Sequence, residues 1–204
     1  MADVKPRFEF RTFAQEFGLV ETRMRSLCPV DKIRESSEIY IVSRANNENN
    51  TKIRDALMDI KVFVQAQKGL EQWNPRMKGE FPMPVGTIRS EVFPAFGVKM
   101  PEFTRDTYTL TQFIDEVIRA HPDLTAVSVF KRRFGFTVND CITEVAELLI
   151  NGAAIKTVAV ESTDVEAILK AKEMLGLGDY ENVNYLVAIK RIIGMLPAPK
   201  TWTR

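Results

Sequence analysis

The sequence predicts an α+β protein in which antiparallel strands form a β-barrel or a deeply curled sheet, with helices packed outside. Three observations predict this class. Several strand-like segments alternate apolar and ionisable residues, short turn motifs join some of them into hairpins, and four other segments repeat apolar residues at helical spacing. Helices need an apolar surface to pack on, and the apolar faces of the strands offer one. With 204 residues, the chain can bury a sizeable core.

The first strand is expected at residues 5–13. There Phe8 and Phe10 share one face, while Arg7, Glu9 and Arg11 share the other. Further strands are expected at 37–44, 51–55, 57–65, 125–138, 141–150 and 153–162. The dipeptides Asp55–Ala56, Asn139–Asp140 and Asn151–Gly152 are expected to be hairpin turns.

Helices are expected at 14–27, 109–121, 162–178 and 182–196. Ser162 or Thr163 is the expected N-cap of the third, which closes on glycine. His121 lies at the end of the second and is interpreted as a helix C-terminal cap, not as a catalytic group.

The organisation predicted from these elements is a single domain over residues 1–204 with two β-rich halves. A loop-rich insert rich in Pro, Gly and Met separates them at about 74–107. The insert and Trp73 have two interpretations that the sequence leaves open, a lid over a tunnel mouth or a packed surface loop.

Composition excludes several functions. The net charge of +1 gives no general attraction to nucleic acid or membrane, so neither is expected as a partner. No apolar run is long enough to span a bilayer. The two cysteines, Cys28 and Cys141, lack a paired spacing and favour a reducing cytoplasm. A single histidine argues against a zinc site.

The polar strand faces are mostly basic in a chain that is nearly neutral overall. They carry Arg7, Arg11, Lys52, Arg54, Lys61, Lys131 and Arg133. A half-exposed sheet with solvated charges is the simpler interpretation. If the sheet closes into a barrel, the same charges line its interior instead. Arginine and lysine there would bind polyphosphate through charge-assisted hydrogen bonds, and a few carboxylates would hold a hard divalent cation.

A series of motifs in order along the chain resembles the CYTH superfamily, the triphosphate tunnel metalloenzymes. The motifs are RFEFR at 7–11, EIY at 38–40, KIRDALMDIK at 52–61, KRR at 131–133 and TEVAELLINGAAIKTVAVES at 143–162, followed by a helix. The resemblance covers roughly residues 5–195. It implies an eight-stranded antiparallel tunnel that takes a small-molecule triphosphate or polyphosphate, with Mg²⁺ or Mn²⁺ as cofactor.

The resemblance also implies roles for individual residues. The catalytic set is Glu9, Lys61, Glu144 and Glu161, the metal ligands are Glu9, Glu144 and Glu161, and the seven cations named above bind phosphate. Glu144 is preferred to Glu147 as the inward-facing acid because it alternates with Ile142 and Ala146.

Two positions depart from the family pattern. Arg7 and Ala159 stand where the family has metal-binding glutamates, and Arg7 is expected to pair with Glu9 or with a substrate phosphate. Three functions therefore stay open: a metal-dependent triphosphatase, a non-catalytic module that binds a phosphorylated ligand, and an adenylate cyclase-type nucleotide cyclase. A monomer and a homodimer are both open.

Overall fold

The structure, a computed structural model that describes residues 6–202, contains a closed eight-stranded antiparallel barrel. The predicted fold class is confirmed. The order around the barrel is β1-β10-β9-β8-β2-β3-β4-β5. The barrel strands are β1 (Phe8–Ala14), β2 (Lys32–Val42), β3 (Asn49–Arg54), β4 (Leu57–Gln67), β5 (Leu70–Glu80), β8 (Thr125–Val138), β9 (Cys141–Ile150) and β10 (Ala153–Ser162).

The three predicted hairpin turns are confirmed. Both residues of each have positive φ, with values of 52° and 57° at Asp55–Ala56, 49° and 58° at Asn139–Asp140, and 46° and 86° at Asn151–Gly152. Two consecutive positive φ angles are typical of type I′ turns, whose twist matches that of the flanking strands. A fourth such turn, Lys68–Gly69, joins β4 to β5 and was not expected from the sequence.

One strand is longer than expected, and another was not expected at all. β2 begins at Lys32, well before the expected start at residue 37. β5 runs to Glu80, so residues 74–80 are a strand and not part of a loop-rich insert. Pro75 lies within β5 and has no N–H to donate to a ladder, which is why this segment reads as a loop in the sequence.

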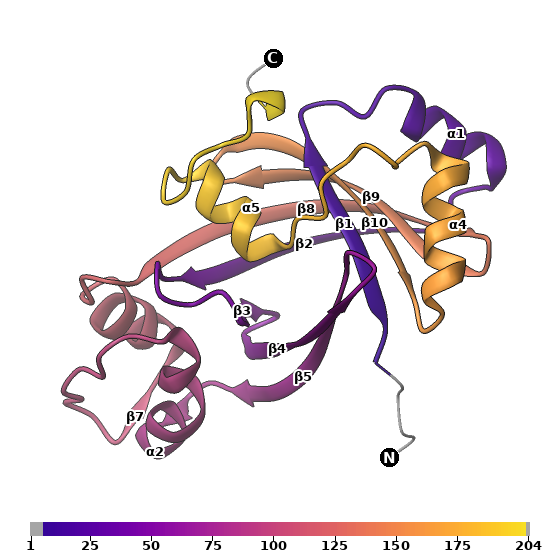
Figure 1. The fold of residues 1–204 in the computed structure, drawn as a ribbon. Coiled ribbons are helices and arrows are strands. Elements are labelled where there is room, and N and C mark those ends of the chain that lie inside the picture. The colour runs from indigo at the N-terminus through magenta and orange to yellow at the C-terminus, as the bar shows by residue number, and fades with distance from the viewer. Residues whose placement is uncertain (1–5, 203–204) are drawn as a thin grey trace. The chain divides into compact units, whose positions relative to one another are not determined.

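The chain divides into two compact units. Unit one comprises residues up to 36, 64–73 and 130 onward, and unit two comprises 37–63 and 74–129. In unit one, α1 (Leu19–Leu27) and α4 (Val165–Leu175) lie side by side (Figure 1). The apolar face of β1 packs in the same core, which includes Phe10 and Ile168.

The helix ends in unit one differ from the expectation. α1 starts at Leu19 because β1 continues to Ala14. The N-cap of α4 is Asp164, not Ser162 or Thr163, and its carboxylate accepts two backbone N–H bonds. α4 closes on a glycine as expected, but the glycine is Gly176, at a φ of 75°, and not Gly178 at the end of the expected range. α5 spans Tyr185–Ile192, and a 3₁₀ turn follows at Lys200–Trp202.

Unit two packs a layer of short helices against β3 and β4. The elements after β5 are β6 (Met83–Pro84), α2 (Val85–Thr87), a π-helix at Ile88–Val92, a 3₁₀-helix at Phe93–Phe96, β7 (Thr107–Tyr108), α3 (Leu110–Gln112) and a π-helix at Phe113–Ile118. Phe93, Phe96 and Phe113 are buried with Ile53 and Ile60. The insert is therefore a packed layer, the second of its two interpretations.

His121 does not cap its helix through its ring, which corrects the sequence interpretation. Its Nε2 lies 2.8 Å from the carbonyl oxygen of Lys99, and its Nδ1 lies 3.1 Å from the backbone N–H of Asp123. The N–H of Asp123 donates to Nδ1, so Nε2 carries the proton and donates to Lys99. Both ring nitrogens thus hold the loop around the helix end, a structural role.

Within residues 6–202, no helix combines the length and the apolar character that crossing a membrane requires.

Candidate functional site

The inner face of unit one is the polar face of β1, β9 and β10. On β1, Phe8 and Phe10 pack in the core, so Glu9 and Arg11 lie on the opposite side. The strand register pairs Glu9 with Glu161 and Arg11 with Ala159, and it pairs Ala159 with Glu144. Segments about 150 residues apart in sequence thereby bring three carboxylates and one arginine together.

Arg11 is the centre of this group. Its Nε lies 2.6 Å from Glu9, and its two terminal nitrogens lie 3.5 Å from Glu144 and 3.9 Å from Glu161. One of them also donates to the hydroxyl of Thr157 at 3.4 Å. Burial disfavours the charged guanidinium, but the Glu9 carboxylate and other negative neighbours outweigh it, so the pKa of Arg11 is raised well above its usual value. Arg11 is therefore a permanent cation shared by three acids.

Arg7 takes a different partner from the one expected. Its guanidinium lies 3.8 Å from Glu161, while Glu9 pairs with Arg11. The Arg7 side chain is 48% exposed, against 7% for Arg11. Arg7 is thus placed where a ligand from solvent can reach it.

The segment before α5 holds β1 at the position of Arg11. The side-chain oxygen of Asn182 accepts the N–H of Arg11 at 2.8 Å, and the N–H of Val183 donates to the Arg11 carbonyl at 2.6 Å. Asn184 donates to the carboxylate of Glu71 on β5. These bonds replace those of a neighbouring strand and fix where α5 begins.

Tyr185, the first residue of α5, lies beside two of the predicted phosphate-binding cations. The Arg11 guanidinium carbon is 4.7 Å from the ring centroid, and the Lys131 ammonium is 3.8 Å from it. Both distances are typical of cation–π contacts. Sequence reasoning missed Tyr185 because the helical spacing places it in an apolar stripe, and no local signal distinguishes a ring that faces cations.

A cavity of about 450 Å³ lies on unit one, and Arg7 and Glu144 are among its lining residues. Its charged lining residues are Arg7, Asp31, Lys32, Arg34, Arg133 and Glu144. Arg133 donates to Ser36 at 2.6 Å. Lys32 and Arg34 were missed because β2 was expected to start later. Their alternation with Ser36 and Glu38 is the signal that could have found them.

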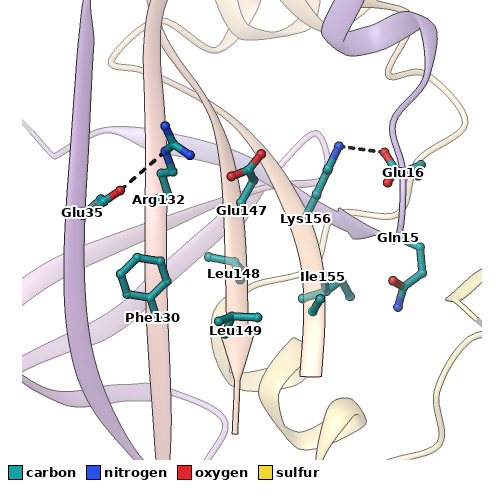
Figure 2. Close-up of a pocket in the computed structure, with 11 residues that line it drawn as sticks. Gln15, Glu16, Glu35, Phe130, Arg132, Glu147, Leu148, Leu149, Ile155 and Lys156 are labelled. Atoms are coloured by element: carbon teal, nitrogen blue, oxygen red, sulfur yellow. Dashed lines mark hydrogen bonds and ion pairs between the residues drawn. The ribbon is translucent and has the colours of Figure 1, made fainter. Parts of the chain in front are cut away.

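Glu144 and Glu147 lie on opposite faces of β9. Glu144 contacts Arg11 on the inner face, whereas Glu147 is exposed and lines a separate hollow (Figure 2). The alternation with Ile142 and Ala146 therefore identified the inward-facing acid correctly.

Unit two carries a second polar cluster around Glu38. This carboxylate has no solvent exposure and lies 3.5 Å from Lys52 and 3.9 Å from Arg54. Arg54 also lies 3.4 Å from Asp59. Burial lowers the pKa of Lys52, Glu38 opposes this shift, and the nearby cations Arg54 and Lys61 add to it. Lys52 and Arg54 are thus already compensated by acids of their own unit.

The expected metal ligands do not form a vacant metal site as they are arranged. Glu9, Glu144 and Glu161 all approach the Arg11 guanidinium. The pKa of Arg11 is raised, so this group stays positively charged among the three carboxylates. Among residues 6–202, no group of three or more His, Cys, Asp or Glu side chains is arranged to hold a metal ion. The arrangement fits a bound guanidinium and not a divalent cation.

The closed eight-stranded antiparallel barrel with helices outside is the CYTH-type tunnel fold, so the resemblance seen in the sequence is confirmed at the level of the fold. No protein-family model and no curated protein sequence matches the chain. Solved structures do match it.

A conserved hypothetical protein from Pyrococcus furiosus has a TM-score of 0.52 and 15% identity, over 88% of this chain and 98% of that one. HpAC1 from Hippeastrum, for which a dominant triphosphatase activity is described, has a TM-score of 0.50 and 14% identity, over 94% and 98%. The PH1012 protein from Pyrococcus horikoshii OT3 has a TM-score of 0.50 and 16% identity, over 90% and 98%. At these identities the similarity establishes the fold.

Proposed function

We propose that the inner face of unit one binds a triphosphate or a related polyphosphate through arginine and lysine side chains, without a resident metal ion. One observation carries this proposal. The 450 Å³ cavity is lined by Arg7, Lys32, Arg34 and Arg133, while the carboxylates of Glu9, Glu144 and Glu161 share the Arg11 guanidinium. Four cations thus line the cavity with only Asp31 and Glu144 as acids.

The cations differ in how far they are engaged within the protein. The side chains of Lys32 and Arg34 are exposed and make no ion pair or hydrogen bond with any other residue of the range 6–202. A phosphate chain carries several negative charges and offers acceptor oxygens to such groups, and arginine binds them in bidentate geometry. Lys32 and Arg34 are therefore the side chains that gain most from a polyanionic ligand.

The solved structures support the ligand class. HpAC1 is described as having a dominant triphosphatase activity, and a protein of Bacillus halodurans with a TM-score of 0.50 is described as a candidate adenylate cyclase. Both activities act on triphosphates, so a shared ligand class is consistent with a shared fold.

Metal-dependent triphosphate hydrolysis is the second candidate function. The observation in its favour is that Glu9, Glu144 and Glu161 surround a single point and keep 24–29% of their side-chain surface exposed. Convergent carboxylate oxygens are the ligand type that Mg²⁺ and Mn²⁺ take. This function requires a rearrangement of Arg11, which is why it ranks second.

Calorimetry with sodium tripolyphosphate, in buffer with a chelator, tests the first proposal. We expect 1:1 binding that Arg34→Met weakens about tenfold, since the loss of one charge-assisted contact is worth about 1.4 kcal/mol in such a site. Lys170→Met, which removes an exposed cation from α4, is the matched control and leaves the affinity unchanged. Absence of binding without metal contradicts the proposal.

A phosphate-release assay separates the two candidates. Tripolyphosphate, thiamine triphosphate and ATP are offered with Mg²⁺, with Mn²⁺ and with chelator, and the ATP products are analysed for a cyclic nucleotide. The first proposal predicts no turnover in any arm. Metal-dependent phosphate release establishes the second candidate instead.

We also propose a cytoplasmic location. Cys28 and Cys141 are both free thiols, and burial raises the pKa of Cys141, which keeps it protonated and unreactive. Unpaired, unreactive cysteines suit a reducing compartment. Growth of cells that express a tagged protein, followed by fractionation, tests the location.

A further inference from the structure

The inner face of unit one is open to solvent at one end of its strands. On β1, the exposed fraction of the side chain falls from 48% at Arg7 to 7% at Arg11. On β9, Ile142 is 48% exposed, whereas Ala146, four residues along the same face, is fully buried. Both strands pair antiparallel with β10, so they run in the same direction and become accessible at the same end. Arg7 and Ile142 both line the 450 Å³ cavity there.

Ile142 is an apolar side chain among charged ones. Of the large apolar side chains that are exposed within residues 6–202, it is the one that lines this cavity. Ile142 lies two residues from Glu144 on β9 and is the register partner of Glu161 on β10. Glu161 in turn lies 3.8 Å from Arg7. The apolar surface is therefore next to an ion pair whose cation belongs to the proposed phosphate site.

Gly135 is the second unusual residue of the cavity lining. It lies in the interior of β8, the strand between β2 and β9. A Cβ atom at this position would lie 3.6 Å from the carbonyl oxygen of Lys32, which is an ordinary van der Waals contact, and the φ angle of Gly135 is not positive. Neither packing nor backbone conformation therefore requires a glycine here. Glycine in a strand interior often marks a place where a ligand approaches the backbone closely.

From these two features we infer that the ligand of this site is an organic phosphate ester, in which an apolar or aromatic group is attached to the phosphate chain. The inference rests on the proposed function, which supplies the phosphate contacts. The phosphate chain contacts cations of the lining such as Arg7 and Arg34. The organic group lies against the backbone at Gly135 and covers Ile142.

The apolar contact gives an affinity that an inorganic chain cannot gain. Covering the exposed part of Ile142 with an organic group removes apolar surface of both partners from water, which is favourable. Small-molecule sites commonly combine apolar surface with a few polar groups that fix the orientation of the ligand. Ile142 and Gly135 are thus assigned as residues that determine specificity, while the cations supply the attraction common to all polyphosphates.

Calorimetry with ATP and with sodium tripolyphosphate, both in buffer with a chelator, tests the inference. We expect ATP to bind the unmodified protein about tenfold more tightly, because the apolar burial adds to the phosphate contacts. Ile142→Ser should weaken ATP binding about fivefold and leave tripolyphosphate binding unchanged, since no charge is altered. Ile33→Ser is the matched control. Ile33 is 56% exposed on β2 but alternates with Lys32, which lines the cavity, and it should change neither affinity.

A second variant tests the approach to the backbone. Gly135→Ala adds one methyl group, for which the neighbouring atoms leave room. We expect it to weaken ATP binding about threefold, because the organic group can no longer lie directly on the strand, and to leave tripolyphosphate binding unchanged. Retained tripolyphosphate binding shows that each variant is folded.

The outcomes separate this inference from the proposed function. If ATP binds no more tightly than tripolyphosphate, or if Ile142→Ser alters the two affinities equally or alters neither, the inference is overturned and the proposed function stands. If the unmodified protein binds neither ligand, the proposed function is overturned and the inference with it.

Discussion

The polar clusters of the two units have opposite arrangements of charge. In unit one a single buried cation, Arg11, is shared by Glu9, Glu144 and Glu161. In unit two a single buried carboxylate, Glu38, lies near Lys52 and Arg54. In each case the central residue is the least exposed member, with 7% of its side chain exposed at Arg11 and none at Glu38.

The comparison shows which residues of each cluster are expected to matter most for stability. Removing a buried central residue leaves several like charges without compensation, which is strongly unfavourable. Removing a more exposed outer member leaves the centre compensated by the others. The centres are therefore expected to matter for stability, while exposed members such as Arg7 remain available to a ligand.

The largest effect is expected for Arg11→Met, which leaves three carboxylates close together. We expect a loss of about 3–5 kcal/mol in the free energy of unfolding at pH 7, measured by urea denaturation. Mutual repulsion raises the carboxyl pKa values in the folded variant, so the folded state binds more protons than the unfolded chain. Stability of the variant should therefore recover as the pH falls from 7 to about 5. A variant as stable as the parent at pH 7 would show that Arg11 is not the centre.

Glu38→Gln is expected to have a smaller effect of about 2–3 kcal/mol, because the amide still accepts hydrogen bonds. Its pH dependence should have the opposite sign. The pKa of Lys52 is already lowered by burial, and losing Glu38 lowers it further. Between that value and the ordinary lysine pKa the unfolded chain binds more protons, so stability rises as the pH rises. Denaturation at pH 7 and pH 9.5 measures this, and a fall in stability over that interval would contradict the account of unit two.

Tyr185→Leu should have an intermediate effect of about 1–2 kcal/mol, because it removes the ring between Arg11 and Lys131. Tyr185→Phe keeps the aromatic face and is the matched control. Thermal unfolding of the two variants isolates the contribution of the ring face. Equal losses in both would assign the effect to the hydroxyl group instead.

The smallest effect is expected for Arg7→Met. Arg7 is 48% exposed and its single ion pair in unit one is long, at 3.8 Å, so the change in stability should be below about 1 kcal/mol. Tripolyphosphate affinity should fall by several-fold all the same, since Arg7 lines the cavity. A large loss of stability with unchanged affinity would reverse the roles given to Arg7 and Arg11.

Local sequence patterns predicted much of this site. Period-2 alternation placed Glu9 and Arg11 on one face of β1, and it chose Glu144 over Glu147 on β9. Positive-φ turn residues such as Asn151–Gly152 defined the hairpins. Each of these features depends on residues within about ten positions of one another, so a single sequence is enough to predict it.

Other features depend on segments that are distant in the chain. The contact of Arg11 with Glu144 and Glu161 follows from the registers of β1 with β10 and of β10 with β9, which no local pattern encodes. β5 was missed because Pro75 and Gly79 are disfavoured in strands, yet tertiary pairing overrides that preference. Tyr185 gains its role from Asn182 and Val183, which bond to the backbone of Arg11.

Binding of Mn²⁺, followed by electron paramagnetic resonance as the ion is titrated into metal-free protein, tests the central claim most directly. The claim is that Arg11 occupies the place among Glu9, Glu144 and Glu161 that a divalent cation would need. We predict that the unmodified protein leaves Mn²⁺ free at micromolar concentration, whereas Arg11→Met binds one ion. Tight binding of Mn²⁺ by the unmodified protein would contradict the claim.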